Sequence, residues 1–387
     1  MTKTMQKIAL FISLFIYVLS IQRTFPTKID DKELTYKSSF LIDEDTTLGQ
    51  EDINISEPDG VGILAVNGAK LTINTGIKIS KIVQNSNLRN LLEENEQSFA
   101  ESDDYIYGLT SAIVAIGPNT EININNAIIT IDCPFSNAFV ALNNAKIFIR
   151  NTTIITKNKY SKGIIAMNHA NIEVSNDIII KTEGDFSPCI EVNKDKGDIL
   201  GFNVNLSTHG EGSPLINAVK DGKLQIIGAE GRAENSPIII IKGDNTVLLH
   251  DCIFSCKGKG NQNIENNYNN GGIIIFNSED YYSNIACLQL FNCEFSVDKD
   301  DEYIPMFSCY HSEIEIILDN TRTSFNNIFM IANQKDEIVN DTKISLILYN
   351  YGIEGKIIAK DNTLINIRAN YELIKNVEKD GNIIIHD

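Results

Sequence analysis

The sequence predicts an all-β protein, a parallel β-helix in which coils of about 25 residues follow one another in single file along one axis. Three observations carry this prediction. Segments of the chain repeat at a fixed offset, each repeat alternates apolar and polar residues with a period of two, and turn-forming residues recur at fixed places in the repeat. The chain has 387 residues, of which 43% are hydrophobic and 22% charged, so it can build a packed core.

The repeat is clearest where residues 136–160 are laid over residues 161–185 at an offset of 25. At several positions along the segment, identical residues are then aligned: serine with serine, alanine with alanine, isoleucine with isoleucine and asparagine with asparagine. The repeat extends backwards to residues 111–135. Forwards, its serine recurs at Ser187, Ser213 and Ser236, at offsets of 26, 26 and 23. A register kept over so many units indicates a repeat architecture.

Inside each unit the apolar residues alternate, as in Ile147-Phe148-Ile149. Successive side chains of a strand point to opposite faces, so one face of each short strand is aliphatic. A unit of 25 residues cannot bury that face alone, and neighbouring units have to stack at the ordinary strand spacing of about 4.8 Å. The LxxLxLxxN spacing of a leucine-rich horseshoe, the alternative at this period, is absent.

Asparagine marks one turn of the predicted coil, at Asn126, Asn151 and Asn176. Asparagine tolerates the left-handed backbone conformation that tight turns require, and its amide can bond to the neighbouring coil. These positions therefore predict a stacked turn.

The N-terminus has the order of a secretory signal peptide: Lys3 and Lys7, an apolar stretch over residues 8–19, and Val18-Leu19-Ser20 as a cleavage site. A membrane anchor, the alternative, would need about 20 apolar residues. We therefore expect a secreted, extracellular chain with no membrane segment after cleavage. The predicted organisation is a signal peptide (1–20), an N-terminal cap region (21–58), a parallel β-helix (59–375) with insertions at 85–110 and 257–271, and a C-terminal tail (376–387).

The net charge of −18 argues against nucleic acid and anionic lipid as partners. Export would also expose asparagine sequons to glycosylation. The candidate glycosylation sites are Asn54, Asn151, Asn205 and Asn340.

The runs SPLINAVKDGKLQIIGAEG, SPIIIIKGDNTVLLHDCIFSC and NGGIIIFNSED resemble secreted, adhesin-like proteins with a right-handed parallel β-helix, the pectin-lyase-like fold. The resemblance covers roughly residues 60–330. It implies a surface or extracellular role, in which the protein binds a glycan or a protein of a host or neighbouring cell.

The same scaffold carries polysaccharide lyases and glycoside hydrolases, so enzymatic residues were sought. The polygalacturonase pattern of NxD, paired Asp, GHG and RxK is absent, and no arginine follows an acidic row. One acidic row does occur, at Asp195, Asp198, Asp221 and Asp244. Such carboxylates could bind calcium or a sugar, whereas the lysines around them are typical of a solvated turn.

Seven cysteines occur, and none forms a zinc-type CxxC pair. Cys252 and Cys293 occupy equivalent places in DCIF and NCEF, one coil apart. Stacked Cα atoms at the strand spacing lie within disulfide range, so a disulfide and a reduced cysteine stack are the two interpretations. The five histidines follow no metal-binding spacing, and no cofactor is predicted.

From these observations we expect a non-catalytic, adhesin-like protein that binds along its flat faces. The first alternative is a polysaccharide lyase or glycoside hydrolase, based on the acidic row. The second is a structural coat or spacer protein.

Overall fold

The structure is a computed structural model of the 387-residue chain. It describes residues 23–82, 103–257, 272–276, 285–298, 305–310, 313–324, 327–330, 342–349, 355–358, 363–369 and 377–386. In these residues the protein is all-β apart from one short helix, α4 (Asp103–Ile106). The strands form three sheets.

The 14-stranded sheet contains β1 (Arg23–Ile29), β2 (Lys32–Ile42), β5 (Gly60–Ala65), β8 (Ile113–Ile116), β11 (Phe139–Leu142), β14 (Ile164–Met167), β17 (Ile190–Asn193), β20 (Ile216–Val219), β23 (Ile239–Lys242), β26 (Ile273–Phe276), β29 (Pro305–Tyr310), β32 (Asn327–Met330), β34 (Gly355–Ile358) and β36 (Val377–Asp380). The 13-stranded sheet contains β3 (Thr46–Leu48), β6 (Lys70–Ile73), β9 (Glu121–Asn125), β12 (Lys146–Arg150), β15 (Asn171–Ser175), β18 (Asp198–Phe202), β21 (Lys223–Ile227), β24 (Thr246–His250), β27 (Ile285–Phe291), β30 (Glu313–Asp319), β33 (Thr342–Tyr349), β35 (Thr363–Arg368) and β37 (Ile383–His386). The 10-stranded sheet contains β4 (Asp52–Ile55), β7 (Ile77–Ile82), β10 (Ala127–Asp132), β13 (Thr153–Thr156), β16 (Ile178–Thr182), β19 (Val204–Thr208), β22 (Glu230–Ala233), β25 (Ile253–Cys256), β28 (Glu294–Val297) and β31 (Arg322–Thr323).

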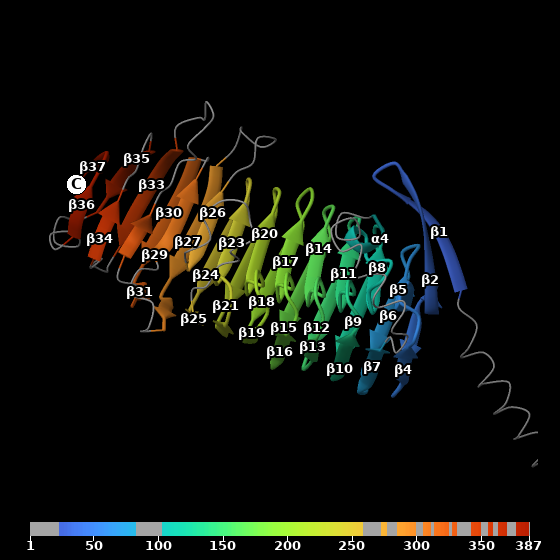
Figure 1. Cartoon of the computed structure of the whole chain (residues 1–387). Coiled ribbons are helices and arrows are strands. Elements are labelled where there is room, and N and C mark those ends of the chain that lie inside the picture. The colour runs from blue at the N-terminus through green and yellow to red at the C-terminus, as the bar shows by residue number, and fades with distance from the viewer. Residues whose placement is uncertain are drawn as a thin grey trace, which may run out of the picture.

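From β2 to β31 each coil contributes one strand to each sheet in turn, and the described strands after β31 belong to the 14-stranded and 13-stranded sheets alone. Every strand pairs in parallel with the strand one coil away, β1 excepted. Coils therefore follow one another along a single axis from the N-terminal to the C-terminal end (Figure 1). The prediction of an all-β, parallel β-helix is confirmed.

The core is a set of aliphatic ladders inside the three sheets. Ile147 pairs with Ile122 on one side and with Ile172 on the other, and all three side chains are fully buried. The period-two pattern places every second residue in this interior. Each ladder buries like against like, and this packing stabilises the stack because a single coil has no core of its own.

The predicted asparagine turn is present. Asn126, Asn151 and Asn176 have φ values of 60°, 47° and 60°, in the left-handed region. The Asn151 Nδ2 donates to the Asn125 Oδ1 of the preceding coil over 2.7 Å. The side chain thus links consecutive coils at a conformation that few other residues adopt at low cost.

The recurring serines form a buried ladder, which explains why the repeat keeps them. The Ser161 backbone N–H donates to Ser187 Oγ, and the Ser187 N–H donates to Ser213 Oγ, each over 2.9 Å. The Ser187 hydroxyl also lies 2.9 Å from the Asp185 carbonyl oxygen, which it can donate to. All three serines are fully buried. Each hydroxyl therefore satisfies a backbone group that would otherwise be buried without a partner.

Replacing Ser187 with alanine should lower the free energy of unfolding by about 1–3 kcal/mol, because the Ser161 N–H loses its acceptor inside the protein. Urea unfolding followed by circular dichroism measures the change, seen as a lower midpoint at unchanged slope. Ser175→Ala is the control, since Ser175 lies on an outer face and is half-exposed. Equal losses in both variants would contradict the role of the ladder.

At the N-terminal end, β1 pairs antiparallel with β2 and forms a hairpin. With residues 105–109 the hairpin covers the outer face of the 14-stranded sheet, where a second apolar cluster includes Tyr36, Tyr107 and Val140. At the hairpin turn, Asp30 accepts from the Tyr107 hydroxyl over 2.8 Å and from the Asn168 side chain over 3.1 Å. The role of residues 21–58 as a cap stays a prediction.

Several expectations lie outside the described residues: the signal peptide, most of the insertions at 85–110 and 257–271, and Asn340. Within the part of the chain that is described, no helix is long and apolar enough to cross a membrane.

Candidate functional site

The predicted acidic row is split between a turn and a strand. Asp195 and Asp221 lie in the turns that leave the 14-stranded sheet, both exposed and both with positive φ, and Asp244 lies half-buried in the next turn of the row. Asp198 is instead the first residue of β18 and pairs with Lys223. No three His, Cys, Asp or Glu side chains among the described residues gather closely enough to hold a metal ion. Calcium binding by this row stays a prediction.

Cys252 and Cys293 do lie in register in adjacent coils, because the residues that follow them, Ile253 and Glu294, are paired. Both are buried free thiols in contact with each other. The hydrogen bond that the Cys293 thiol donates to Cys252, together with burial, raises the pKa of Cys293 far above its ordinary value. The two cysteines thus lie one coil apart in register, and a disulfide between them stays a prediction.

Three of the four sequons can be located, and all three are exposed. Asn54 is in β4, Asn205 is in β19, and Asn151 is at the asparagine turn. Asn151 uses its amide to bond to Asn125, so a glycan there would have to replace that hydrogen bond.

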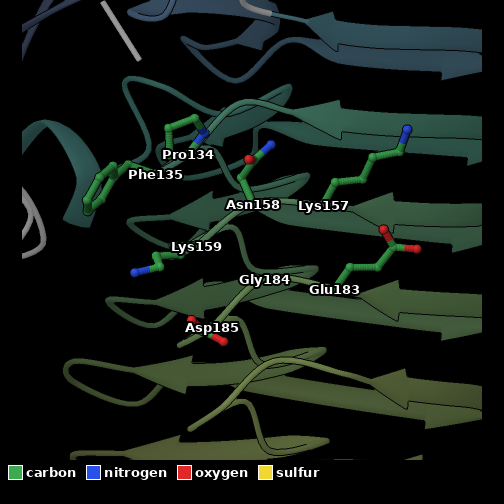
Figure 2. A pocket seen from close by; sticks show the side chains of 8 residues that line it. All are labelled: Pro134, Phe135, Lys157, Asn158, Lys159, Glu183, Gly184 and Asp185. Carbon is green, nitrogen blue, oxygen red and sulfur yellow. The ribbon is translucent and has the colours of Figure 1, made fainter. Parts of the chain in front are cut away.

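A cavity of about 250 Å³ lies at the turns between the 10-stranded and the 14-stranded sheets and contains charged side chains of both signs. Figure 2 shows that its two carboxylates, Glu183 and Asp185, point to opposite sides of Gly184. Asp185 is already engaged, since its Oδ1 accepts from the Glu211 N–H over 2.8 Å. A glycosidase needs two carboxylates that flank one bond, so this arrangement gives no support to hydrolysis.

The outer face of the 13-stranded sheet carries a regular arrangement of side chains. From β9 to β30 its middle position is half-buried and alternates polar and apolar residues coil by coil, and the alternation ends at Thr72 in β6 and at Ile347 in β33. We call this the central row: Asn123, Phe148, Glu173, Leu200, Gln225, Leu248, Gln289 and Ile317. The strands β9 to β30 that carry it lie side by side along the axis (Figure 1).

The two positions beside the central row differ in character. On one side is a polar row in which Lys146 pairs with Glu121, and Asp198 pairs with Lys223. The row on the other side is mixed: Phe202 pairs with Ile227, whereas Arg150 pairs with Asn125, and Phe291 pairs with Asp319. The face is therefore a strip with a polar edge on one side and a mixed edge on the other.

The mixed edge carries a cluster of polar and aromatic contacts near β24 and β27. The His250 ring stacks on Phe291 with the ring centroids 6.3 Å apart, and His250 Nδ1 lies 2.8 Å from an Asp251 carboxylate oxygen. A hydrogen bond from Asn292, together with His250, lowers the pKa of Asp251. On the polar edge, burial raises the pKa of the Cys287 thiol, which therefore stays protonated and unreactive.

The sequence pattern predicts the strands but not the central row. Part of the row was visible in the repeat, because Phe148 and Glu173 are 25 residues apart and aligned by it. Beyond Glu173 the offset varies, and 41 residues separate Leu248 from Gln289. Only the strand pairing shows that the alternation continues across this insertion.

No protein family matches the sequence, and no curated protein or solved structure is significantly similar to it.

Proposed function

We propose that the chain is a secreted, adhesin-like binding protein that holds an extended linear glycan along the outer face of its 13-stranded sheet, without catalysis. The single observation that carries the proposal is the alternation of the central row. Export rests on the N-terminal sequence pattern, and the right-handed, pectin-lyase-like assignment on the resemblance of its repeats.

The alternation matches the chemistry of a polysaccharide chain. Apolar residues of the central row recur every second coil, about 9.6 Å apart at the ordinary strand spacing. In an extended β-linked polysaccharide, successive rings turn opposite faces to the same side, so its repeat is also two units long. Leu200, Leu248 and Phe148 would contact the C–H faces of rings, and Gln225 and Gln289 between them would bond to hydroxyls.

Each such contact is small, and affinity would come from their number. Contacts made by one chain on successive coils act together, because the first raises the effective concentration of the next. We therefore expect affinity to rise steeply with glycan length.

Leu248→Asp should reduce retention on the bound glycan by about 10-fold or more. The reason is that the substitution places a charge among the apolar residues of the central row, where a sugar ring would make contact. Affinity electrophoresis of the purified secreted chain through a panel of soluble polysaccharides measures retention. Ile253→Asp is the matched control, since Ile253 is 52% exposed on a different sheet.

Retention on no polysaccharide, or equal losses in both variants, would refute the proposal. Reducing ends and unsaturated products are followed in the same samples, with and without calcium. Product formation that is lost in Asp221→Ala would replace the proposal with the polysaccharide-degrading alternative.

A further inference from the structure

On the outer face of the 14-stranded sheet, a buried carboxylate, that of Glu191, occupies a position at which the neighbouring coils of the repeat carry aliphatic side chains. From β8 onward its first outward row is Val114, Val140 and Ile165, and it then changes to Glu191 and Asn217 before it returns to Ile240 and Ile274. Glu191 is 1% exposed. An aliphatic side chain at position 191 would continue the row at no electrostatic cost. A contribution to the stability of the fold therefore does not by itself explain why a carboxylate occupies this position.

Glu191 is held by three donors. Its Oε1 accepts from Lys162 Nζ over 2.7 Å and from Asn193 Nδ2 over 2.9 Å. Its Oε2 accepts from Asn217 Nδ2 over 2.8 Å. A carboxylate offers about four lone-pair positions, so the cluster can accept one further donor without losing a bond.

Tyr105, from α4, covers the cluster. Lys162 Nζ lies 5.1 Å from the centroid of its ring. Burial raises the pKa of Tyr105 well above its ordinary value, which keeps its hydroxyl neutral. Burial alone would lower the pKa of Lys162, but the Glu191 carboxylate and Tyr105 outweigh burial and raise it. Lys162 and Glu191 therefore form a buried ion pair in which the two charges compensate each other.

The cluster opens on a cavity of about 290 Å³. Ile165 and Met167 form its apolar floor, Tyr105 and Ile106 one wall, and Lys162, Glu191 and Asn193 its polar end. Ligand pockets in proteins start at about 300 Å³, so the space suits a single small ring. Its floor residues Ile165 and Met167 belong to the apolar cluster that also includes Tyr36 of the N-terminal hairpin, so the cavity adjoins the part of this face that the hairpin covers.

We infer that this cavity binds one uncharged sugar ring, with the hydroxyls on Glu191 and Asn193 and the C–H face on Met167 and Tyr105. A carboxylate beside an amide presents adjacent acceptors and donors, which is the pattern that neighbouring hydroxyl groups require. An aromatic wall and an aliphatic floor suit the apolar face of a pyranose.

The neutrality of the polar end determines which sugars fit. Because Lys162 and Glu191 already compensate each other, an acidic or basic sugar would bury an unpaired charge, which is costly. The site should therefore prefer neutral hexoses and N-acetylhexosamines to uronic acids and hexosamines. The inference does not depend on the glycan face, by which we mean the outer face of the 13-stranded sheet proposed above to bind a polysaccharide.

The test uses the full secreted chain and saturation-transfer NMR with methyl glycosides of glucose, galactose, mannose, N-acetylglucosamine and glucuronic acid. Met167→Phe adds a ring to the cavity, and Asn193→Leu removes the amide and leaves the Lys162–Glu191 pair intact. Val219→Phe is the matched control, because it adds the same ring at an outward position of β20 that does not line the cavity. Thermal unfolding shows that each variant is folded.

We expect at least one neutral glycoside to bind the wild-type chain and Val219→Phe equally, and to bind each cavity variant at least 10-fold more weakly. The methyl glycoside of glucuronic acid should bind neither the wild-type chain nor any of the variants. Lack of binding by every neutral glycoside, or unchanged binding in folded Met167→Phe, would overturn the inference. Leu248→Asp, on the glycan face, should leave this binding unchanged, so failure of either proposal can be told from failure of the other.

Discussion

Replacing Glu191 with alanine should destabilise the protein by about 3–5 kcal/mol, because it leaves the Lys162 ammonium buried without its counter-charge. Chemical unfolding monitored by circular dichroism measures this loss. Glu183→Ala is the matched control: Glu183 pairs with Lys181 over the same 2.7 Å, but both side chains are more than a third exposed. Its loss should be about 0–1 kcal/mol, since water screens the pair.

The double variant Lys162→Met/Glu191→Leu distinguishes the cost of an unpaired charge from a net contribution of the pair. The change at Glu191 continues the outward aliphatic row of the sheet, and the change at Lys162, in the turn before β14, removes the ammonium group at similar side-chain volume, so we expect stability equal to the wild type or higher by about 1–4 kcal/mol. A double variant as unstable as Glu191→Ala would show that the pair itself stabilises the fold. Restored stability would strengthen the case that the pair is kept for binding.

Lys81→Met should also be strongly destabilising, with a loss of about 3 kcal/mol or more. Lys81 occupies an interior position of β7, fully buried, and its Nζ donates to the carbonyl oxygens of Pro58, Gly60 and Thr110. Methionine fills the same space but leaves three carbonyl groups without that donor, at about 1 kcal/mol or more each. The control is Lys78→Met on the same strand, where the side chain is exposed and the loss should be small.

The same lysine should make stability depend on pH above neutrality. Burial lowers the pKa of Lys81 to about 8, below the value near 10.5 of an unfolded chain. Between these values the unfolded state binds more protons, so the stability of the folded protein rises with pH. The difference in unfolding free energy between wild type and Lys81→Met should therefore increase from pH 8 toward pH 10.5. A constant difference would mean that Lys81 titrates alike in both states.

Much of the fold could be predicted because a solenoid repeats its local rules. The offset of 25 aligned Ile147 with Ile172, and the pairing found is the pairing predicted. Asn126 and Asn151 indicated a left-handed turn, which each adopts. The cysteine register was also correct for Cys252 and Cys293. In each case the reason is that contacts lie one coil away and follow from sequence spacing.

The two proposed binding sites could not be predicted in the same way. The central row crosses coils of unequal length, so its alternation appears only when strand pairing restores the register between Leu248 and Gln289. The Glu191 site needs Tyr105, which is 86 positions earlier in the chain and lies in an insertion that no repeat offset aligns.

The sequence by itself determined the coil, its period, its buried ladders and its turns, because each depends on residues within one or two coils. Tertiary structure decided which outward positions meet. It placed Tyr105 over Lys162 and beside the same cavity as Glu191, and it buried a lysine, Lys81, among backbone carbonyls of two other segments. The physical reason is that outward side chains are free of the core's packing constraint, so the pattern of the repeat does not specify their partners. Those partners come from the hairpin and the insertion, which break the repeat.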